Sequence, residues 1–307
     1  MSKTTQPIYV IGSINTDMVV MTNNLPTPGE TVMGGEFIMT AGGKGANQAV
    51  AATRLGGDVT MVARLGADIF GDQSVTRLEG EEINCDFVSR DQEAASGVAL
   101  ISVDEEGENH IVVAPGANNT LSIDTINKAL SSLPENAIVL LQLEIPIETV
   151  AHVIASTKDS DRKVILDPAP ARELTGNFLD GLFLITPNET EATHLSGIEV
   201  SDKESARLAA KKLLQTGVQN VVITMGADGV LLASSDKNMQ FITSPTVNAV
   251  DTTAAGDCFN GALAVSIANG LSLEEGINKA CHAASISVTR KGAQDSMPFS
   301  EEVNLCL

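Results

Sequence analysis

The stretch AVDTTAAGDCFNGAL at residues 249–263 contains two aspartates, Asp251 and Asp257, and three of the smallest residues stand directly before the second one. Apolar residues continue beyond it at a helical spacing, starting with Phe259 and Leu263, which predicts a helix that begins at or just before Asp257. The first amides of a helix have no partners within it and carry the positive end of its dipole. The small residues would let a phosphoryl group reach those amides, with Asp257 placed to take a proton from an attacking hydroxyl. The alternative interpretation is an acidic first turn packed tightly against a sheet.

Short apolar runs alternate with amphipathic segments along the rest of the chain. The run IYVIGSI at 8–14 leads to a predicted helix over about 46–55, and AIVLLQLEIP at 137–146 leads to one over 146–157. This alternation predicts an α/β fold of three layers, α/β/α, with a mostly parallel central sheet covered on both faces.

Two regions, 18–40 and 96–116, lack helical patterns and resemble β-hairpins, with alternating β-branched residues and Gly, Pro and Asn between them. We expect them to form a small β-sheet lid over the carboxyl edge of the main sheet, where open α/β sheets bind their ligands. Residues 1–307 are expected to form a single domain with this lid.

The chain has 307 residues and is acidic, with 19 Lys plus Arg against 39 Asp plus Glu and a net charge of −20. Such a charge disfavours binding to nucleic acids and to anionic membrane surfaces. The four cysteines are scattered and form no CxxC pair, which disfavours a zinc cluster or a disulfide framework. No apolar run approaches a membrane span or a signal peptide, so a cytoplasmic protein is expected.

The glycine-rich stretch TAGGKGANQAVAATRLGG at residues 40–57 matches neither a Walker A loop nor a dinucleotide fingerprint. It predicts a flexible turn that opens into a helix, with Lys44, Asn47 and backbone amides facing one small volume. Such a turn suits an anion or a small hydroxylated ligand, and close helix–sheet packing is an equally good explanation.

Polar residues also follow the predicted strands. Asn15 and Asp17 stand two apart at the end of the first strand, where they could hold vicinal hydroxyls or form an Asx turn. Glu144 closes a buried run, which is also simply a common way for a strand to end. Asn188 and Glu191 fall one helical turn apart at a strand-to-helix junction, where they could meet phosphate and hydrated Mg²⁺ or only begin a helix.

A further turn follows the strand VVIT, in the stretch VVITMGADGV. Its residues Thr224, Gly226 and Gly229 could cradle a nucleotide or form a plain hairpin turn.

Taken together, AGGKGANQAVAATRLG and DTTAAGDCFNGAL resemble the two signature stretches of the ribokinase-like sugar kinases. The resemblance extends to GSINTD, to the N-x-x-E motif at 188–191, to TMGADG and to VTRKGAQ at 288–294, and so covers essentially the whole chain. The sequences GGKGANQA and TRKGAQ most resemble the ribokinase branch of this family. That resemblance implies phosphorylation of D-ribose at its 5-hydroxyl by ATP, with Mg²⁺ accompanying the phosphates.

The resemblance also implies roles for individual residues. Asp257 matches the general base, and the backbone amides of Ala254, Ala255, Gly256 and Asp257 match an anion hole. The positions that match sugar contacts are Asn15, Asp17, Gly43, Lys44, Asn47 and Glu144. The positions that match nucleotide contacts are Asn188, Thr224, Gly226, Gly229 and His282, with Glu191 acting on Mg²⁺ through water.

A monovalent-cation site for K⁺ next to the anion hole is implied as well. Its matching positions are Asp251, Thr253, Ser287, Arg290, Gly292 and Ser296, mostly through backbone carbonyls. Asp251 as a helix cap or turn acid is the alternative, and the adjacent Asp295 has no role that the sequence explains. The exposed lid strands predict a homodimer, since free strand edges favour association.

Three other interpretations compete with this one. A related kinase of the same fold could act on deoxyribose, fructose, a keto-deoxy sugar acid or a nucleoside, although Asp17 would repel a carboxylate substrate. A non-catalytic sugar-binding protein on the same fold is disfavoured by the retained AAGD sequence at residues 254–257. A nucleotide-dependent oxidoreductase lacks its fingerprint.

Overall fold

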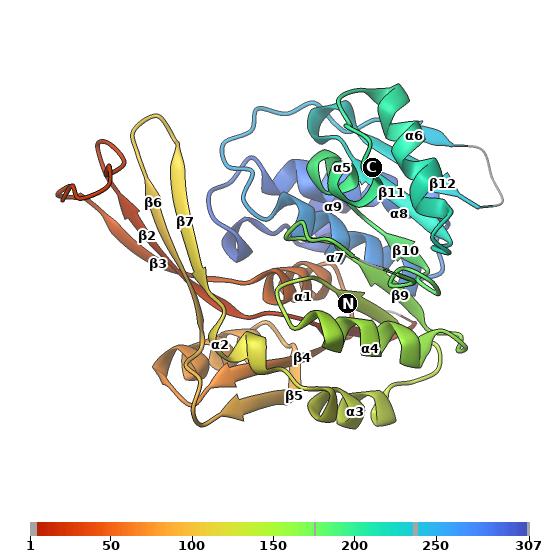
Figure 1. Ribbon diagram of the computed structural model, residues 1–307, viewed down its shortest axis with the longest axis horizontal. Helices are drawn as coiled ribbons and strands as arrows, with labels where there is room; N and C mark the ends of the chain where they lie inside the picture. Colours follow the sequence, from red (N-terminus) through yellow and green to blue (C-terminus); the bar gives the residue numbers. More distant parts are fainter. Residues whose placement is uncertain (1–4, 175, 236–238, 306–307) are drawn as a thin grey trace.

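The computed structural model describes residues 5–174, 176–235 and 239–305, which form a nine-stranded sheet with helices on both faces (Figure 1). The strand order is β13-β12-β11-β10-β9-β8-β1-β4-β5. All neighbouring strands are parallel except β11–β12 and β12–β13, which are antiparallel, so the predicted mostly parallel sheet is confirmed. The strands are β1 (Ile8–Ile11), β4 (Val59–Gly66), β5 (Asn84–Asp91), β8 (Ile138–Leu141), β9 (Lys163–Leu166), β10 (Leu184–Ile185), β11 (Asn220–Thr224), β12 (Val230–Ser234) and β13 (Gln240–Ile242).

The three layers follow from the alternation of side chains along these strands. Ile8 and Val10 of β1 join one hydrophobic core, and Tyr9 and Ile11 join the other, because successive strand residues point to opposite faces. The first core is closed by α1 (Lys44–Arg54), α2 (Ile69–Gly80), α7 (Ala255–Ala268), α8 (Leu273–Ser287) and α9 (Ser300–Asn304). The second is closed by α3 (Ile123–Ser132), α4 (Ile147–Thr157), α5 (Glu189–Ser196) and α6 (Lys203–Leu214).

The lid is a separate four-stranded sheet that projects from one side of the main body (Figure 1). Its order is β3-β2-β6-β7, with bounds β2 (Asn15–Met21), β3 (Phe37–Gly42), β6 (Gly97–Val103) and β7 (Asn109–Ala114). Both regions predicted to form the lid contribute two strands each.

Two local predictions need correction. Asn15 and Asp17 do not end the first strand: β1 stops at Ile11, and both residues open the lid strand β2. The chain changes sheets here because the side chain of Asn118 pairs with both backbone groups of Ile14, in place of a strand neighbour. The helix expected from residue 46 starts at Lys44, directly after Gly43 at φ 88°. Among the residues described, no helix has the length and apolarity to cross a bilayer.

Candidate active site

The start of α7 leaves backbone amides open to the carboxyl edge of the sheet. Ala254 caps the helix in the left-handed conformation (φ 58°) and makes no side-chain cap bond. The Ala255 amide donates to the carbonyl of Thr252 (3.2 Å), which corrects the prediction that all four amides of residues 254–257 are available. Within the described residues, the amides of Gly256 and Asp257 have no intramolecular acceptor. No heavy atom lies within 4 Å of the position that a Cβ on Gly256 would occupy, so the space beside this glycine is open.

Asp257 lies on the inner side of this turn and is buried, at 4% exposure. Its Oδ2 accepts a hydrogen bond from Asn47 Nδ2 (2.9 Å) and its Oδ1 accepts one from Gln48 Nε2 (3.0 Å). Burial raises the pKa of Asp257 above its ordinary range, against the lowering by the Lys44 ammonium and by the two amide donors. A carboxylate with a raised pKa beside an open anion site is suited to accept a proton from a hydroxyl.

The turn at Gly43 and Lys44 is fixed by Glu144. The Glu144 carboxylate accepts hydrogen bonds from Ser13 Oγ (2.5 Å) and from the Lys44 amide (3.0 Å), so it holds this turn against the end of β1. A Cβ on Gly43 would lie 2.6 Å from the Asn15 amide, and that position has a positive φ, so only glycine fits there.

The electrostatics of the pocket are set by several carboxylates around one lysine. Burial by itself would lower the pKa of Lys44, but the surrounding carboxylates, led by Asp257 and Asp167, outweigh it and raise that pKa. Burial, with the negative charges of Glu144 and Asp257, raises the pKa of Asp17 to about 6. Lys44 therefore stays charged, and Asp17 changes its protonation state close to neutral pH.

Asn188 and Thr224 lie side by side, because an isolated parallel bridge joins them beyond the ends of β10 and β11. Asn188 and Glu191 form a capping box at the start of α5, with Asn188 Oδ1 accepting from the Glu191 amide (2.8 Å) and Glu191 Oε2 from the Asn188 amide (2.9 Å). Among the described residues, Asn188 Nδ2 and Glu191 Oε1 make no hydrogen bond and can take other partners.

The turn after β11 runs through the 3₁₀ segment η2 (Gly226–Asp228) into β12, so it is a hairpin turn. A Cβ on Gly226 would meet no atom within 4 Å, and that face of the turn is therefore open. His282 lies on α8, where Nδ1 is 2.8 Å from the Asn278 carbonyl oxygen. The nucleotide contacts of these residues stay predictions.

The predicted cation-site residues come from the segment before α7, the end of α8 and the loop after it. Asp251 Oδ1 accepts from the Thr253 amide (2.9 Å) and its Oδ2 accepts from the Gly292 amide (2.8 Å), which joins the two segments. Burial alone would raise the pKa of Asp251, but the hydrogen bonds from Thr253 and Gly292 lower it overall. Ser287 and Ser296 are buried, and their hydroxyls donate to backbone carbonyls. The Arg290 side chain pairs with Glu302, and its backbone amide donates to the Ser287 carbonyl (3.0 Å).

Asp295 is one of the residues through which this loop contacts α1 and α2. It forms an ion pair with Arg77 of α2, whose Nε also donates to Gln294 Oε1 (2.9 Å). From α1, Arg54 donates to the carbonyls of Gln294 (2.8 Å) and Met297 (3.0 Å). The structure thus supplies the explanation that the sequence lacks: Asp295 fastens the loop to α2.

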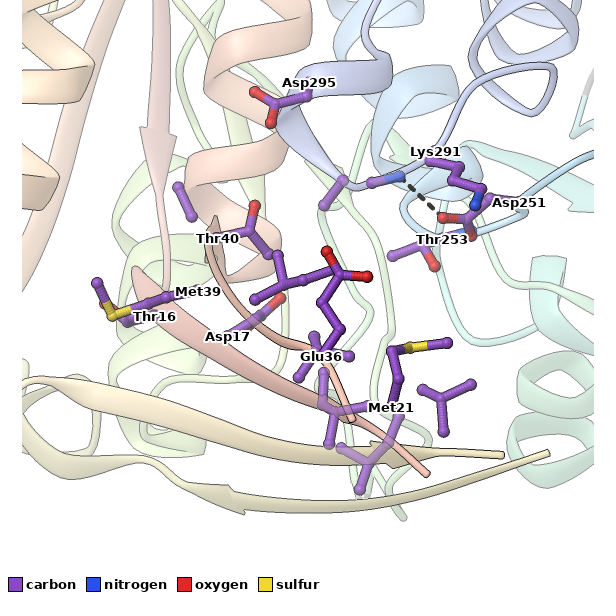
Figure 2. Close-up of a pocket in the computed structure, with 18 of the residues that line it drawn as sticks. Thr16, Asp17, Met21, Glu36, Met39, Thr40, Asp251, Thr253, Lys291 and Asp295 are labelled. Atoms are coloured by element: carbon purple, nitrogen blue, oxygen red, sulfur yellow. Dashed lines mark hydrogen bonds between the residues drawn. The ribbon is translucent and has the colours of Figure 1, made fainter. Parts of the chain in front are cut away.

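A cleft of about 1240 Å³ separates the lid from this loop. Figure 2 shows Asp17 and Thr40 of the lid on one side, and Asp251, Thr253 and Lys291 on the other. The cleft therefore lies between the lid and the loop that leads into α7, and the function of the lid stays a prediction.

Comparison with known proteins fits this geometry. The family model described as pfkB family carbohydrate kinase matches residues 5–300. The chain belongs to this family. The pfkB kinase is 40% identical over 295 residues to a ribokinase of Haemophilus influenzae, which covers 96% of each chain. It is also 40% identical over 298 residues to a deoxyribokinase of Salmonella typhi, covering 97% of each.

The fold of this pfkB kinase is also that of solved structures. The Arabidopsis thaliana ribokinase complexed with ribose and ATP superposes with a TM-score of 0.89 at 34% identity, covering 99% of this chain and 98% of that one. The family and the fold expected from the sequence are therefore confirmed, and the chain is an ATP-dependent carbohydrate kinase.

Four polar residues of this pfkB kinase were not predicted as part of the site: Gln48, Asn118, Gln142 and Asp167. Asn118 Nδ2 donates to Asn15 Oδ1 (2.8 Å), which orients the Asn15 amide. The other three form a buried chain that ends at Asp257. The available signal was their position, since Gln142 and Asp167 directly follow buried strands at the carboxyl edge.

Proposed function

We propose that this kinase transfers the γ-phosphate of ATP to the 5-hydroxyl of D-ribose and releases ADP and D-ribose 5-phosphate. The observation that carries the proposal is Asp257: a buried carboxylate with a raised pKa, at the rim of open helix amides and in contact with Asn47. The ribokinase relatives, one of them solved with ribose and ATP, support ribose as the acceptor.

The sugar is held between the lid and the turn after β3. Ionised Asp17 accepts hydrogen bonds from hydroxyls, and Asn15, oriented by Asn118, keeps its Nδ2 to donate. Gly43, Lys44 and Asn47 form the floor, and Glu144 keeps that floor in place. The 5-hydroxyl then faces Asp257.

Asp257 takes the proton of the 5-hydroxyl as the oxygen of that hydroxyl attacks the γ-phosphorus. The amides of Ala254, Gly256 and Asp257 stabilise the charge on the transferred phosphoryl oxygens, because they are fixed and aimed into open space. Lys44 adds a permanent positive charge to the site. The nucleotide lies along Asn188 and the turn at Thr224 to Gly229, with His282 beside the base, and Glu191 would hold Mg²⁺ through a water molecule. When bound, Mg²⁺ neutralises phosphate charge.

A K⁺ ion fits the loop region around Asp251, whose donor set is oxygen-rich and already tied together by the Thr253 and Gly292 amides. Its ligands would be Asp251, Thr253, Ser287, Arg290, Gly292 and Ser296, mainly through carbonyl oxygens. A bound cation there would order the segment that leads into α7.

The lid also supports a homodimer. The face turned away from the cleft carries Phe37, Leu100 and Val112, which are 60%, 51% and 65% exposed. Apolar side chains this exposed on one face mark an association surface, and the lid has two free strand edges, β3 and β7. We propose that residues 1–307 work as one domain of such a dimer in the cytoplasm, where Cys85, Cys258 and Cys281 stay free thiols.

Phosphorylation of 2-deoxyribose is the second candidate, since the deoxyribokinase relative is as similar as the ribokinase one. Comparing turnover with the two sugars separates the candidates.

Asp257→Asn tests the mechanism. We expect a loss of kcat of about 10²–10⁴-fold, the range for a missing general base, with ribose binding by calorimetry retained. Wild-type turnover in this variant would overturn the role of Asp257.

A further inference from the structure

Gln48 is a fully buried glutamine in the second turn of α1, and it bonds to two acids at once. Its Nε2 donates to Asp257 Oδ1 (3.0 Å) and to Asp167 Oδ2 (2.8 Å). One amide nitrogen has two hydrogens, so both are used.

The orientation of this amide is fixed by its neighbour. Gln142, which directly follows β8, donates from Nε2 to Gln48 Oε1 (2.6 Å). The Oε1 of Gln142 packs against Gly12, 1.9 Å from the position that a Cβ there would take, and it has no hydrogen-bond partner among the described residues. With its Oε1 accepting from Gln142, Gln48 presents its amide nitrogen as the donor to the two carboxyl groups.

The two acids do not have equal support. Asp257 accepts hydrogen bonds from two side-chain amides, those of Asn47 and Gln48. Among the described residues, Asp167 accepts a side-chain hydrogen bond from Gln48 alone. Both acids are buried, and the negative charge of Asp257 disfavours ionisation of Asp167. Hydrogen bonds to a carboxylate stabilise its charged form, so the negative charge belongs on the better supported acid.

We propose that Gln48, held by Gln142, is a positioning residue that keeps Asp257 ionised and aimed at the substrate while Asp167 carries a proton. This inference rests on the proposed role of Asp257 as the general base. Other charged groups face the pair from neighbouring elements: Lys44 of α1, Glu144 after β8, Glu191 of α5 and Asp17 of β2. Lys44 and Glu144 act on both acids, whereas among the described residues the Asn47 amide bonds to Asp257 and not to Asp167, so Asn47 is the side-chain donor that distinguishes the two acids.

The test is the pH dependence of kcat for Gln48→Met and Asp167→Asn. Removing the Gln48 amide takes one donor from Asp257, so we expect the acid limb of kcat to move up by about one pH unit and the plateau to fall about 10-fold. KM for ribose and for ATP should stay within about two-fold. Asp167→Asn replaces a protonated acid by another neutral group, so its acid limb should stay within about 0.3 pH unit of wild type.

Two results would overturn the proposal: an unshifted acid limb in Gln48→Met, or a limb lowered by a full unit in Asp167→Asn, which would mean that Asp167 is ionised. The control is Asn220→Leu, since Asn220 is also a buried amide with two bonds but lies at the start of β11, away from the site. It should reduce thermal stability without moving the pH profile.

Gln142→Met keeps the test decisive if Gln48→Met does not fold, because Gln142 bonds to Gln48 and not to Asp257. Its acid limb should move in the same direction, with a kcat loss of about three-fold, and an unshifted limb would count against the proposal. Asp257→Asn tests the role of Asp257 separately from the role of Gln48. If that variant is inactive while Gln48→Met keeps the wild-type profile, only the role of Gln48 fails.

Discussion

Gly256→Ala should change the stability of the fold and the rate of catalysis in opposite directions. Gly256 lies in the first turn of α7, is exposed, and has no heavy atom within 4 Å of the position that an alanine methyl group would take. The fold therefore tolerates alanine, and the gain in helix propensity should stabilise the protein by about 0.5–1 kcal/mol. In a chain of this length that corresponds to a rise in Tm of about 1–2 °C.

The same methyl group enters the space in which the phosphoryl oxygens must approach the amides to about 2.7–3.1 Å. Losing the use of one such donor typically costs about 10²–10³-fold in kcat, and that is the loss we expect. The assay is ADP release with MgATP and saturating ribose, beside thermal unfolding of the same preparation.

Gly80→Ala is the matched control. Gly80 is also an exposed helical glycine with no atom within 4 Å of a Cβ, but it lies at the far end of α2. It should show a similar gain in Tm with unchanged kcat. A Gly256→Ala enzyme that keeps kcat within about three-fold of wild type would refute the argument that this side chain is missing to admit a phosphoryl group.

Three further predictions follow from the lid and its surroundings. KM for ribose, measured by steady-state kinetics, should be about 10-fold higher at pH 5 than at pH 7.5. Asp17, with a pKa of about 6, loses its charge as the pH falls and then accepts hydrogen bonds from hydroxyls less well. The Asp17→Asn variant should show no such dependence of KM on pH. Leu100→Asp should convert a dimer into a monomer by analytical ultracentrifugation, whereas Leu208→Asp, equally exposed on α6, should not. Asp251→Ala should reduce the ratio of activity in K⁺ to activity in Na⁺ by about 10-fold, because the Thr253 and Gly292 amides lose their shared acceptor. An unchanged ratio would mean that the cation binds elsewhere.

The sequence was sufficient for the parts of the fold that follow local patterns. The alternation of buried strands and helices predicted the main sheet, and α4 and α7 lie where their apolar spacing placed them. The edge strand β5 was missed, because its sequence NCDFVSRD mixes polar and apolar residues on a half-exposed strand. The change of sheet at Ile14 was missed for a different reason: it depends on Asn118, which is 104 residues away in the chain.

The candidate site divides in the same way. Residues in glycine-rich or small-residue motifs, such as Lys44 and Asp257, could be singled out from the sequence. Gln48, Gln142 and Asp167 could not, since each looks like an isolated polar residue until the carboxyl ends of β8 and β9 meet the second turn of α1. Contacts of this kind depend on the packing of three elements and leave no local pattern.

The most direct test of the central claim is ADP release with MgATP across ribose, 2-deoxyribose, fructose and adenosine, each in K⁺ and in Na⁺, with the product identified by mass spectrometry. The account predicts strong turnover on ribose, higher in K⁺, with D-ribose 5-phosphate as the product. Absence of turnover on ribose in the presence of K⁺, with or without activity on another acceptor, would contradict it.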